Sequence, residues 1–470
     1  MMNSHNTRRI RLIAEVQQCL LLAVPLAAAQ IAESATVFVD TVMMGWLGSQ
    51  SIASGGLGAS IFIFFLLITT ATLSAVSPLV AEAYGAGKPE QVGYIVRQGL
   101  GISLLLGIPI TVLLWHGGTL LVLLGQNTNT ATLAQTYLRA IAWGLIPGLG
   151  FAVLRSFLAA ISQPQLVMVT IVLGTLLNFI ANYVLMFGKL GLPVMGLAGI
   201  GWASTLSLWS MFLALVIYIL TQHRFAVYKI FQLSPNYNFT QQQRRILWQI
   251  FQVGLPIGGL MAVEAGFFTV VMFIMGKLGT TALAAHQIAL QTASMSYQIA
   301  LGISLATTIR IGQLLGEQKV AVARLAGYVG IALGALSMTI TGIIFWLVPQ
   351  LVVSLYLDIN NPNNQDVVIL AVKLLAVAAI FQIVDGIQIT AAGALRGLKD
   401  TRIPMLIGIV AYWCIGLVIG YTLGIWFNYG PIGLWCGLAI ALAIAATVLT
   451  VRFRILSSGW KKEVVSRNEV

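Results

Sequence analysis

The sequence predicts an all-α polytopic membrane protein whose twelve transmembrane helices form two pseudo-symmetric six-helix bundles. Of the 470 residues, 59% are hydrophobic and 8% are charged, and the mean hydropathy is +0.93, whereas soluble domains are about one quarter charged. The apolar character extends almost from end to end, and a spanning helix needs about 20 mostly apolar residues. An internal repeat further divides the chain into two similar halves.

The predicted spans are long apolar runs separated by glycine, proline, asparagine or charged residues. In chain order they are residues 17–46, 52–83, 94–115, 133–161, 165–187, 195–221, 246–276, 282–314, 324–357, 367–395, 403–426 and 431–455. The broadest polar break, 223–245, is predicted to be a cytoplasmic linker between an N-terminal lobe (1–222) and a C-terminal lobe (246–456). Residues 457–470 are predicted to form a cytoplasmic tail.

Basic residues define the expected orientation. With the N-terminus inside, 21 of the 25 Lys and Arg residues, including Arg155, fall in inner loops and tails. The other four lie at or near outer segment ends: Arg139, Lys189, Lys277 and Lys373. Positive charge favours the cytoplasmic side of a membrane. The sequence therefore predicts a multi-pass protein of the plasma (inner) membrane with both termini in the cytoplasm.

The two halves match at a single gap-free offset. The shift that aligns Pro25 with Pro256 superposes seven further identical pairs, including Glu33 on Glu264. Each half has six predicted spans, so the repeats share one topology, as in transporters built from parallel repeats. Substrate is then expected near the interface of the two bundles; the alternative is a duplication retained only for packing.

Carboxylates inside predicted spans are the strongest candidates for a functional site, because charge at membrane depth is costly. Glu33 and Asp40 lie in the first span, Glu264 in the seventh and Asp385 in the tenth. Glu33 and Asp40 are seven residues apart and share one helix face. No Lys or Arg lies in the apolar middle of the other two helices, so Glu264 and Asp385 are expected to take up a proton or another cation. The alternative is that each neutral carboxyl group hydrogen-bonds a neighbouring helix.

Amide and hydroxyl oxygens and two prolines extend this set. Asn178 and Asn182 lie one turn apart on the fifth span, and Ser204 lies on the sixth. Such oxygens suit hard cations beside Asp40, and interhelical hydrogen bonding is an equal alternative. Pro25 and Pro256 hold equivalent mid-helix positions and predict kinks, with a moving hinge as a further hypothesis.

Other classes of function lack their characteristic residues. The formal net charge of +12 is concentrated in loops and tails, so no nucleic-acid partner is expected. The three cysteines are scattered, and the sequence has no CxxC pair, no phosphate-binding P-loop and no HExxH motif. We therefore expect a secondary transporter, not an enzyme, with no cofactor or nucleotide. A channel is the alternative to a secondary transporter, but the paired acidic residues and the repeated halves favour a transporter that works by alternating access. The oligomeric state is left open.

Three motifs in order resemble the MATE multidrug and toxic compound exporters, specifically the NorM-type branch. They are FVDTVMMG at residues 38–45, AAHQIAL at 284–290, and DGIQ at 385–388 continuing through AAGALRGLKD at 391–400. The likeness covers essentially the whole chain. It implies a V-shaped pair of six-helix bundles that alternates between outward- and inward-facing forms. Such a protein exports organic cations or other amphipathic compounds in exchange for Na⁺ or H⁺.

The resemblance also assigns residues. Asp40 matches the acidic residue of the N-terminal lobe, surrounded by the asparagine pair and Ser204. Glu264 and Asp385 match the acidic pair of the C-terminal lobe, where Na⁺ is a candidate ion. Phe381, one turn before Asp385, has no hydroxyl where some members use a tyrosine, so Na⁺ and H⁺ both stay open.

The family pattern does not include Glu33, whose equivalence to Glu264 comes from the repeat alone. Within the wider superfamily, the alternative is a flippase for lipid-linked precursors or polysaccharides. A flippase would need a cationic central cavity for anionic head groups. The sequence offers buried acids instead and has no cluster of Lys or Arg inside the membrane, which favours the exporter.

Overall fold

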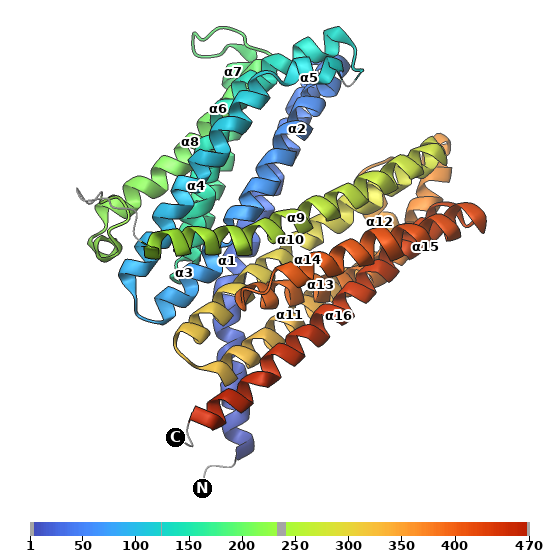
Figure 1. Cartoon of the computed structure of the whole chain (residues 1–470). Coiled ribbons are helices and arrows are strands. Elements are labelled where there is room, and N and C mark those ends of the chain that lie inside the picture. The colour runs from blue at the N-terminus through green and yellow to red at the C-terminus, as the bar shows by residue number, and fades with distance from the viewer. Residues whose placement is uncertain (1–3, 124, 233–240, 468–470) are drawn as a thin grey trace. The chain divides into compact units, whose positions relative to one another are not determined.

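The computed structural model of the chain describes residues 4–123, 125–232 and 241–467, and every regular element among them is a helix (Figure 1). Twelve of the described helical stretches are long and apolar enough to cross a membrane, which confirms the predicted number of spans. Large apolar side chains such as Leu105, Leu173 and Phe273 stay exposed on these helices, as expected for surfaces that contact lipid.

The first half of the chain contains eight α-helices and a 3₁₀ helix. These elements are α1 (Ser4–Trp46), α2 (Ser49–Leu73), α3 (Val76–Gly85), α4 (Pro89–Trp115), α5 (Gly117–Leu123), α6 (Thr128–Ala160), α7 (Pro164–Phe187), α8 (Leu197–Thr221) and η1 (His223–Tyr228).

The second half repeats this pattern with more irregular segments. Its elements are α9 (Gln241–Lys277), α10 (Thr280–Gly316), α11 (Val320–Leu347), α12 (Pro349–Ser354), η2 (Pro362–Asn364), α13 (Gln365–Gly397), α14 (Arg402–Ile409), η3 (Val410–Gly416), α15 (Leu417–Tyr421), η4 (Thr422–Trp426) and α16 (Gly430–Arg467).

Two predicted spans are interrupted for local reasons. The second is divided into α2 and α3, because Pro78 cannot donate a hydrogen bond to the Ser74 carbonyl and the Ser74 hydroxyl bonds back to Ala71. The ninth was predicted to reach residue 357, but α11 ends at Leu347. Proline disfavours helical geometry in the residue before it, and Pro349 instead starts α12.

The eleventh predicted span is continuous but contains two π-helical segments, η3 and η4. A π-helical turn widens the hydrogen-bonded ring and frequently marks a functional site. At the other end of the chain, α1 begins at Ser4 and not at the predicted residue 17, because the basic segment before the apolar run continues the same helix.

Backbone proximity divides the chain into two compact units. The N-terminal unit is Ala28–Gly258, and the C-terminal unit joins Met1–Ala27 to Gly259–Val470. The first part of α1, up to Ala27, therefore belongs to the C-terminal unit, and the first part of α9, up to Gly258, belongs to the N-terminal unit. The predicted lobes 1–222 and 246–456 instead assigned each of these two helices to a single lobe. Residues 233–240 of the predicted linker and 468–470 of the predicted tail lie outside the described residues.

Close helix contacts explain this exchange. In the C-terminal unit, a Cβ atom on Gly302 of α10 would lie 2.5 Å from the backbone of Ala27, so glycine permits α1 to approach. In the N-terminal unit, a Cβ atom on Gly254 of α9 would overlap the Thr72 carbonyl oxygen, and Gly258 also faces Thr72. Ala27 and Gly258 are equivalent positions under the shift that aligns Pro25 with Pro256, so the repeat preserves the arrangement.

An ion pair adds to the first of these contacts. Arg310 of α10 donates hydrogen bonds of 2.6 and 3.0 Å to the two carboxylate oxygens of Glu15 on α1. Glu15 is buried, and a two-point guanidinium–carboxylate contact has a defined geometry as well as charge. The start of α1 is therefore held on α10 within the C-terminal unit.

Each unit is organised around one central helix. In the N-terminal unit α6 packs against α2, α4 and α8, and in the C-terminal unit α13 packs against α10, α11 and α16 (Figure 1). The helices α1 and α9 each contribute residues to both units. Both helices continue through their prolines, and the change of unit falls two residues after Pro25 and two after Pro256.

Candidate functional site

The N-terminal unit has a partly open cavity of about 320 Å³ between α1, α2, α6, α7 and α8. One face of α1 lines it, since its lining residues follow helical spacing: Glu33, Thr36, Val37, Asp40, Thr41 and Met44. Most of the remaining wall is apolar and includes Phe62, Leu66, Phe151 and Met211. A largely apolar cavity of this volume with a few polar groups is typical of small-molecule sites.

Asp40 stands at the centre of a polar cluster on this wall. Asn182 Nδ2 donates a 2.6 Å hydrogen bond to Asp40 Oδ1, and Ser204 Oγ donates a 3.0 Å bond to Asp40 Oδ2. Asn178 Nδ2 donates to Ser204 Oγ at 3.2 Å, and Asn182 Nδ2 also donates to Asn178 Oδ1 at 3.0 Å. The structure thus brings together all four residues that the sequence placed in the N-terminal site.

The local sequence explains why these side chains meet. Asn178 and Asn182 are four residues apart on α7, so both point to one side. A Cβ atom on Gly199 would lie 2.8 Å from the Leu185 backbone, and glycine therefore lets the start of α8 approach α7. This contact brings Ser204, five residues later, within reach of Asn178.

One oxygen of the cluster is unused. Asn182 Oδ1 is buried and accepts no hydrogen bond from the described residues. A buried amide oxygen without a partner is unfavourable, and here it is next to a carboxylate. The arrangement leaves one amide oxygen beside Asp40 without a hydrogen-bond partner among the described residues.

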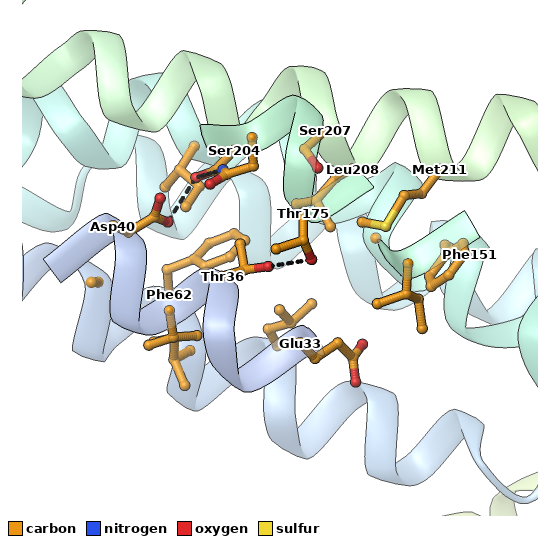
Figure 2. A pocket seen from close by; sticks show the side chains of 18 of the residues that line it. Glu33, Thr36, Asp40, Phe62, Phe151, Thr175, Ser204, Ser207, Leu208 and Met211 are labelled. Carbon is orange, nitrogen blue, oxygen red and sulfur yellow. Dashed lines mark hydrogen bonds between the residues drawn. The ribbon is translucent and has the colours of Figure 1, made fainter. Parts of the chain in front are cut away.

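Two threonines continue the polar wall along α1. Thr36 and Thr175 hydroxyls are 2.8 Å apart, and Thr175 Oγ1 also donates to the Ala32 carbonyl at 3.2 Å. Figure 2 shows this pair between Asp40 and Glu33, with Phe151 and Met211 on the apolar side of the cavity. The hydroxyl pair ties α1 to α7 beside Asp40.

Glu33 is paired in a way that the sequence reading missed. Arg155 Nη1 on α6 lies 2.6 Å from Glu33 Oε1, and both residues line the cavity. The sequence assigned Arg155 to the basic residues of the inner loops and tails, but it lies within α6. Glu33 is therefore not a second isolated acid beside Asp40.

The predicted acids of the second half lie in the C-terminal unit. Asp385 on α13 is buried, and it lies close enough to Glu264 on α9 for the two carboxylates to repel each other. Neither makes a hydrogen bond or ion pair with another described residue. Their ionised forms interact electrostatically with two tyrosines that the sequence reading did not select, Tyr297 on α10 and Tyr412 in η3.

Tyr412 is held beside Glu264 by its neighbours. Its ring stacks on Phe267, three residues after Glu264, with centroids 5.4 Å apart. The adjacent Trp413 donates from Nε1 to the Val263 carbonyl at 3.0 Å. Tyr412 is fully buried, and its hydroxyl has no hydrogen-bond partner among the described residues. The π-helical register of η3 places both aromatic side chains against α9.

Phe381, the aromatic residue one helical turn before Asp385, has a packing role. Phe381 is 3% exposed, and its ring meets Trp435 edge-on with centroids 5.5 Å apart. Trp435 Nε1 in turn donates to His286 Nδ1 at 3.1 Å. Phe381 thus contributes no oxygen, and the nearby unpartnered hydroxyl is that of Tyr412. In the described part of the chain no three His, Cys, Asp or Glu side chains form a metal-binding group.

Comparison with known proteins identifies the family. The MatE family model matches residues 25–184 and 256–422, and the two matches begin at Pro25 and Pro256, the pair that aligns the sequence repeat. The chain is 44% identical to a probable multidrug resistance protein NorM from Synechococcus sp. over 95% of both chains. It is 42% identical to one from Synechocystis sp. over 98% of this chain and 99% of the relative.

Solved structures agree at the level of the fold. A MATE transporter in the bent conformation is similar with a TM-score of 0.85 at 20% identity, over 96% of this chain and 97% of that one. A eukaryotic MATE transporter is similar with a TM-score of 0.82 at 20% identity, over 97% of this chain and all of that one. The predicted fold class is therefore confirmed, and the chain belongs to the MatE family, in its NorM-type branch.

Proposed function

We propose that this membrane protein is a secondary active multidrug exporter that moves amphipathic organic cations out of the cell in exchange for Na⁺ or H⁺. The observation that carries the proposal is the Asp40 cluster: a partly buried carboxylate, hydrogen-bonded by Asn182 and Ser204, on the wall of a mostly apolar cavity. The names of the relatives from Synechococcus and Synechocystis support export of drugs.

Asp40 would attract the positive centre of the transported compound. The apolar part of the compound would contact aromatic and methionine side chains such as Phe62, Phe151 and Met211. Methionine is flexible and polarisable and tolerates ligands of different shapes. A single unpaired carboxylate in a mostly apolar, adaptable cavity therefore suits a range of organic cations.

In the C-terminal unit, Glu264 and Asp385 would bind the coupling ion. Two nearby carboxylates without described partners favour a bound positive charge, because it relieves both their mutual repulsion and their burial. The hydroxyl of Tyr412 would supply a neutral oxygen in place of the one that Phe381 lacks. Carboxylate and hydroxyl oxygens suit Na⁺, and the same carboxylates accept a proton.

Export then follows from differential affinity. Entry of the coupling ion in the outward-facing form favours release of the organic cation outside, and the next organic cation binds from the cytoplasm after reorientation. A ligand shifts such an equilibrium only by the difference between its affinities for the two forms. The expected location is the plasma membrane, with both termini in the cytoplasm, as the distribution of basic residues predicts.

The flippase alternative is less well supported by the same cavity. Its lining contains one basic residue, Arg155, and that residue is paired with Glu33. A site for anionic lipid head groups would present unpaired positive charge.

Transport into everted membrane vesicles, whose cytoplasmic face is outside, would test the proposal. A fluorescent organic cation is loaded by imposing either a Na⁺ gradient or a pH gradient, for the wild type and for Asp385→Asn at equal membrane content. Uptake driven by one gradient and absent in the variant is expected and names the ion. Wild-type protein that is correctly inserted but inactive with both gradients would remove the exporter hypothesis.

A further inference from the structure

The charges on the cavity wall can be counted. The carboxylates and guanidinium groups that line it are Glu33, Asp40 and Arg155. Arg155 and Glu33 are joined at 2.6 Å, so they cancel each other. The wall therefore carries one net negative charge, on Asp40.

The three groups are also arranged in order along the cavity. Glu33 and Asp40 are two helical turns apart on α1, which corresponds to about 10 Å along the helix. Figure 2 shows Glu33 and Asp40 on either side of the Thr36–Thr175 pair. A compound whose cationic centre meets Asp40 thus extends toward the ion pair.

Both partners of the ion pair remain accessible. The side chains of Arg155 and Glu33 are 25% and 40% exposed, and both belong to the cavity lining. A ligand in the cavity therefore meets the guanidinium group of Arg155 directly and at short range, where electrostatic interactions are only partly screened.

We propose that Arg155 neutralises Glu33 and so limits the cavity wall to one net negative charge, with the result that the cavity accepts organic monocations and discriminates against dications. This inference rests on the proposed export of organic cations. One positive charge neutralises the cavity when it binds at Asp40. A second positive charge has no acid to pair with, because Glu33 is already neutralised by Arg155.

Four versions of the protein vary the charge in single steps. The net charge of the wall is −1 in the wild type, 0 in Glu33→Gln, −2 in Arg155→Gln and −1 again in the double variant. Glu33→Gln preserves the side-chain length, whereas Arg155→Gln shortens the side chain, and Arg155→Lys keeps a long side chain at that position. The double variant is the matched control, because it removes the guanidinium group but restores the wild-type net charge. Arg155→Lys retains the positive charge and serves as a second control.

Ethidium and propidium are suitable probes, because they share one aromatic ring system and carry one and two positive charges. Their binding to the purified full-length protein is measured by fluorescence anisotropy at mildly alkaline pH, which keeps free carboxylates ionised. The readout is the ratio of the propidium to the ethidium association constant. This ratio cancels changes in packing that affect both dyes alike.

A change of one unit in the charge of the cavity wall changes the electrostatic binding energy of propidium twice as much as that of ethidium, because propidium carries twice the charge. At about 10 Å in a medium of intermediate dielectric, one charge step corresponds to about a tenfold change in the ratio. The ratio is expected to rise about tenfold in Arg155→Gln and to fall about tenfold in Glu33→Gln. In the double variant and in Arg155→Lys it is expected to stay within about twofold of the wild type.

Two results would overturn the inference while leaving the exporter hypothesis intact. One is a ratio that stays constant through the series although the wild type binds ethidium. The other is a double variant that behaves like Arg155→Gln, because the effect would then come from removing the guanidinium group and not from net charge. Failure of the wild type to bind ethidium would reject the proposed function, and with it this inference.

Discussion

Asn182 donates a 2.6 Å hydrogen bond to Asp40 through its amide nitrogen, while its amide oxygen, equally buried, has no partner in the described chain. A group that served only to hold Asp40 between helices would use both ends of the amide. Because unpaired buried oxygens are unfavourable, we expect this one to take a partner that the described residues do not supply. The relationship between the two residues therefore favours a binding role over simple packing.

The first prediction concerns Asp40. Asp40→Asn keeps the shape of the side chain and an acceptor for Asn182, but it removes the negative charge. We expect affinity for an organic monocation to fall at least about tenfold, because a charge-assisted contact is lost. Equilibrium binding of ethidium and efflux from intact cells would both measure this loss.

The same substitution at Asp366, which is exposed at the start of α13, is the matched control and should leave binding unchanged. Efflux by Asp40→Asn within about twofold of the wild type, at equal amounts of inserted protein, would contradict a role for this carboxylate in binding.

The second prediction separates coupling from drug binding. Asp385→Asn and Glu264→Gln each remove one of two neighbouring carboxylates in the C-terminal unit. We expect gradient-driven efflux to be lost, because the coupling ion no longer has its full negative site, while ethidium binding in the N-terminal unit persists. Vesicle transport and anisotropy on the same preparations would give the two readouts, with Asp366→Asn again as control.

Normal gradient-driven efflux by well-inserted Asp385→Asn would rule out the proposed coupling site. Equal loss of ethidium binding and of transport would instead place the drug, and not the ion, at these acids.

The third prediction concerns the hydroxyl of Tyr412. Tyr412→Phe removes only a buried oxygen that has no described partner. Stability should stay the same or rise by about 1 kcal/mol, since the uncompensated burial of the hydroxyl is relieved. If this oxygen contacts the coupling ion, the ion concentration for half-maximal efflux should rise about tenfold.

An ion ligand is distinguished from a packing residue by two results together: the protein is as stable as before or more stable, but it needs a higher ion concentration for efflux. Tyr421→Phe, on the following helical segment and exposed, should change neither. If the ion dependence of efflux is unchanged in Tyr412→Phe, the unpartnered hydroxyl of Tyr412 does not take part in coupling.

The sequence was sufficient for those features that depend on summed apolarity and on spacing. Twelve spans followed from hydropathy, and the two family matches begin at Pro25 and Pro256, the same pair that aligns the repeat. Helix interruptions were harder, because apolarity does not reveal hydrogen-bond register. The π-helical segment around Tyr412 lies in a long apolar run, and the break at Ser74 lies in a segment whose serines, threonines and Pro78 still leave the hydropathy of the span high.

In the candidate site, too, the sequence predicted some residues but not all of their contacts. Asp40, Asn178 and Asn182 were found because polar residues inside spans are rare, and they do meet in the structure. The partner of Glu33 was missed because Arg155 lies far along the chain on another helix and nothing in its local sequence indicates which face it occupies. Long-range pairs of this kind require the tertiary arrangement of the helices.

The exchange of helix segments between units gives the last prediction. Gly302→Ala places a methyl group 2.5 Å from the backbone of Ala27, and backbone atoms cannot rotate away as a side chain can. We expect the first part of α1 to be displaced from α10, with a loss of about 2 kcal/mol in the free energy of unfolding. Thermal unfolding of the purified protein in detergent would detect this as a lower Tm.

Two further variants decide whether the close contact is the cause. Gly101 lies inside α4, where a Cβ atom would meet only open space, so Gly101→Ala should be neutral or stabilising by up to about 1 kcal/mol through helix propensity. Gly254→Ala, whose methyl group would overlap the Thr72 carbonyl oxygen, should lower Tm as Gly302→Ala does, because both glycines admit the first part of a repeat-equivalent helix. Equal Tm values for all three variants would show that the exchanged segments do not depend on these contacts.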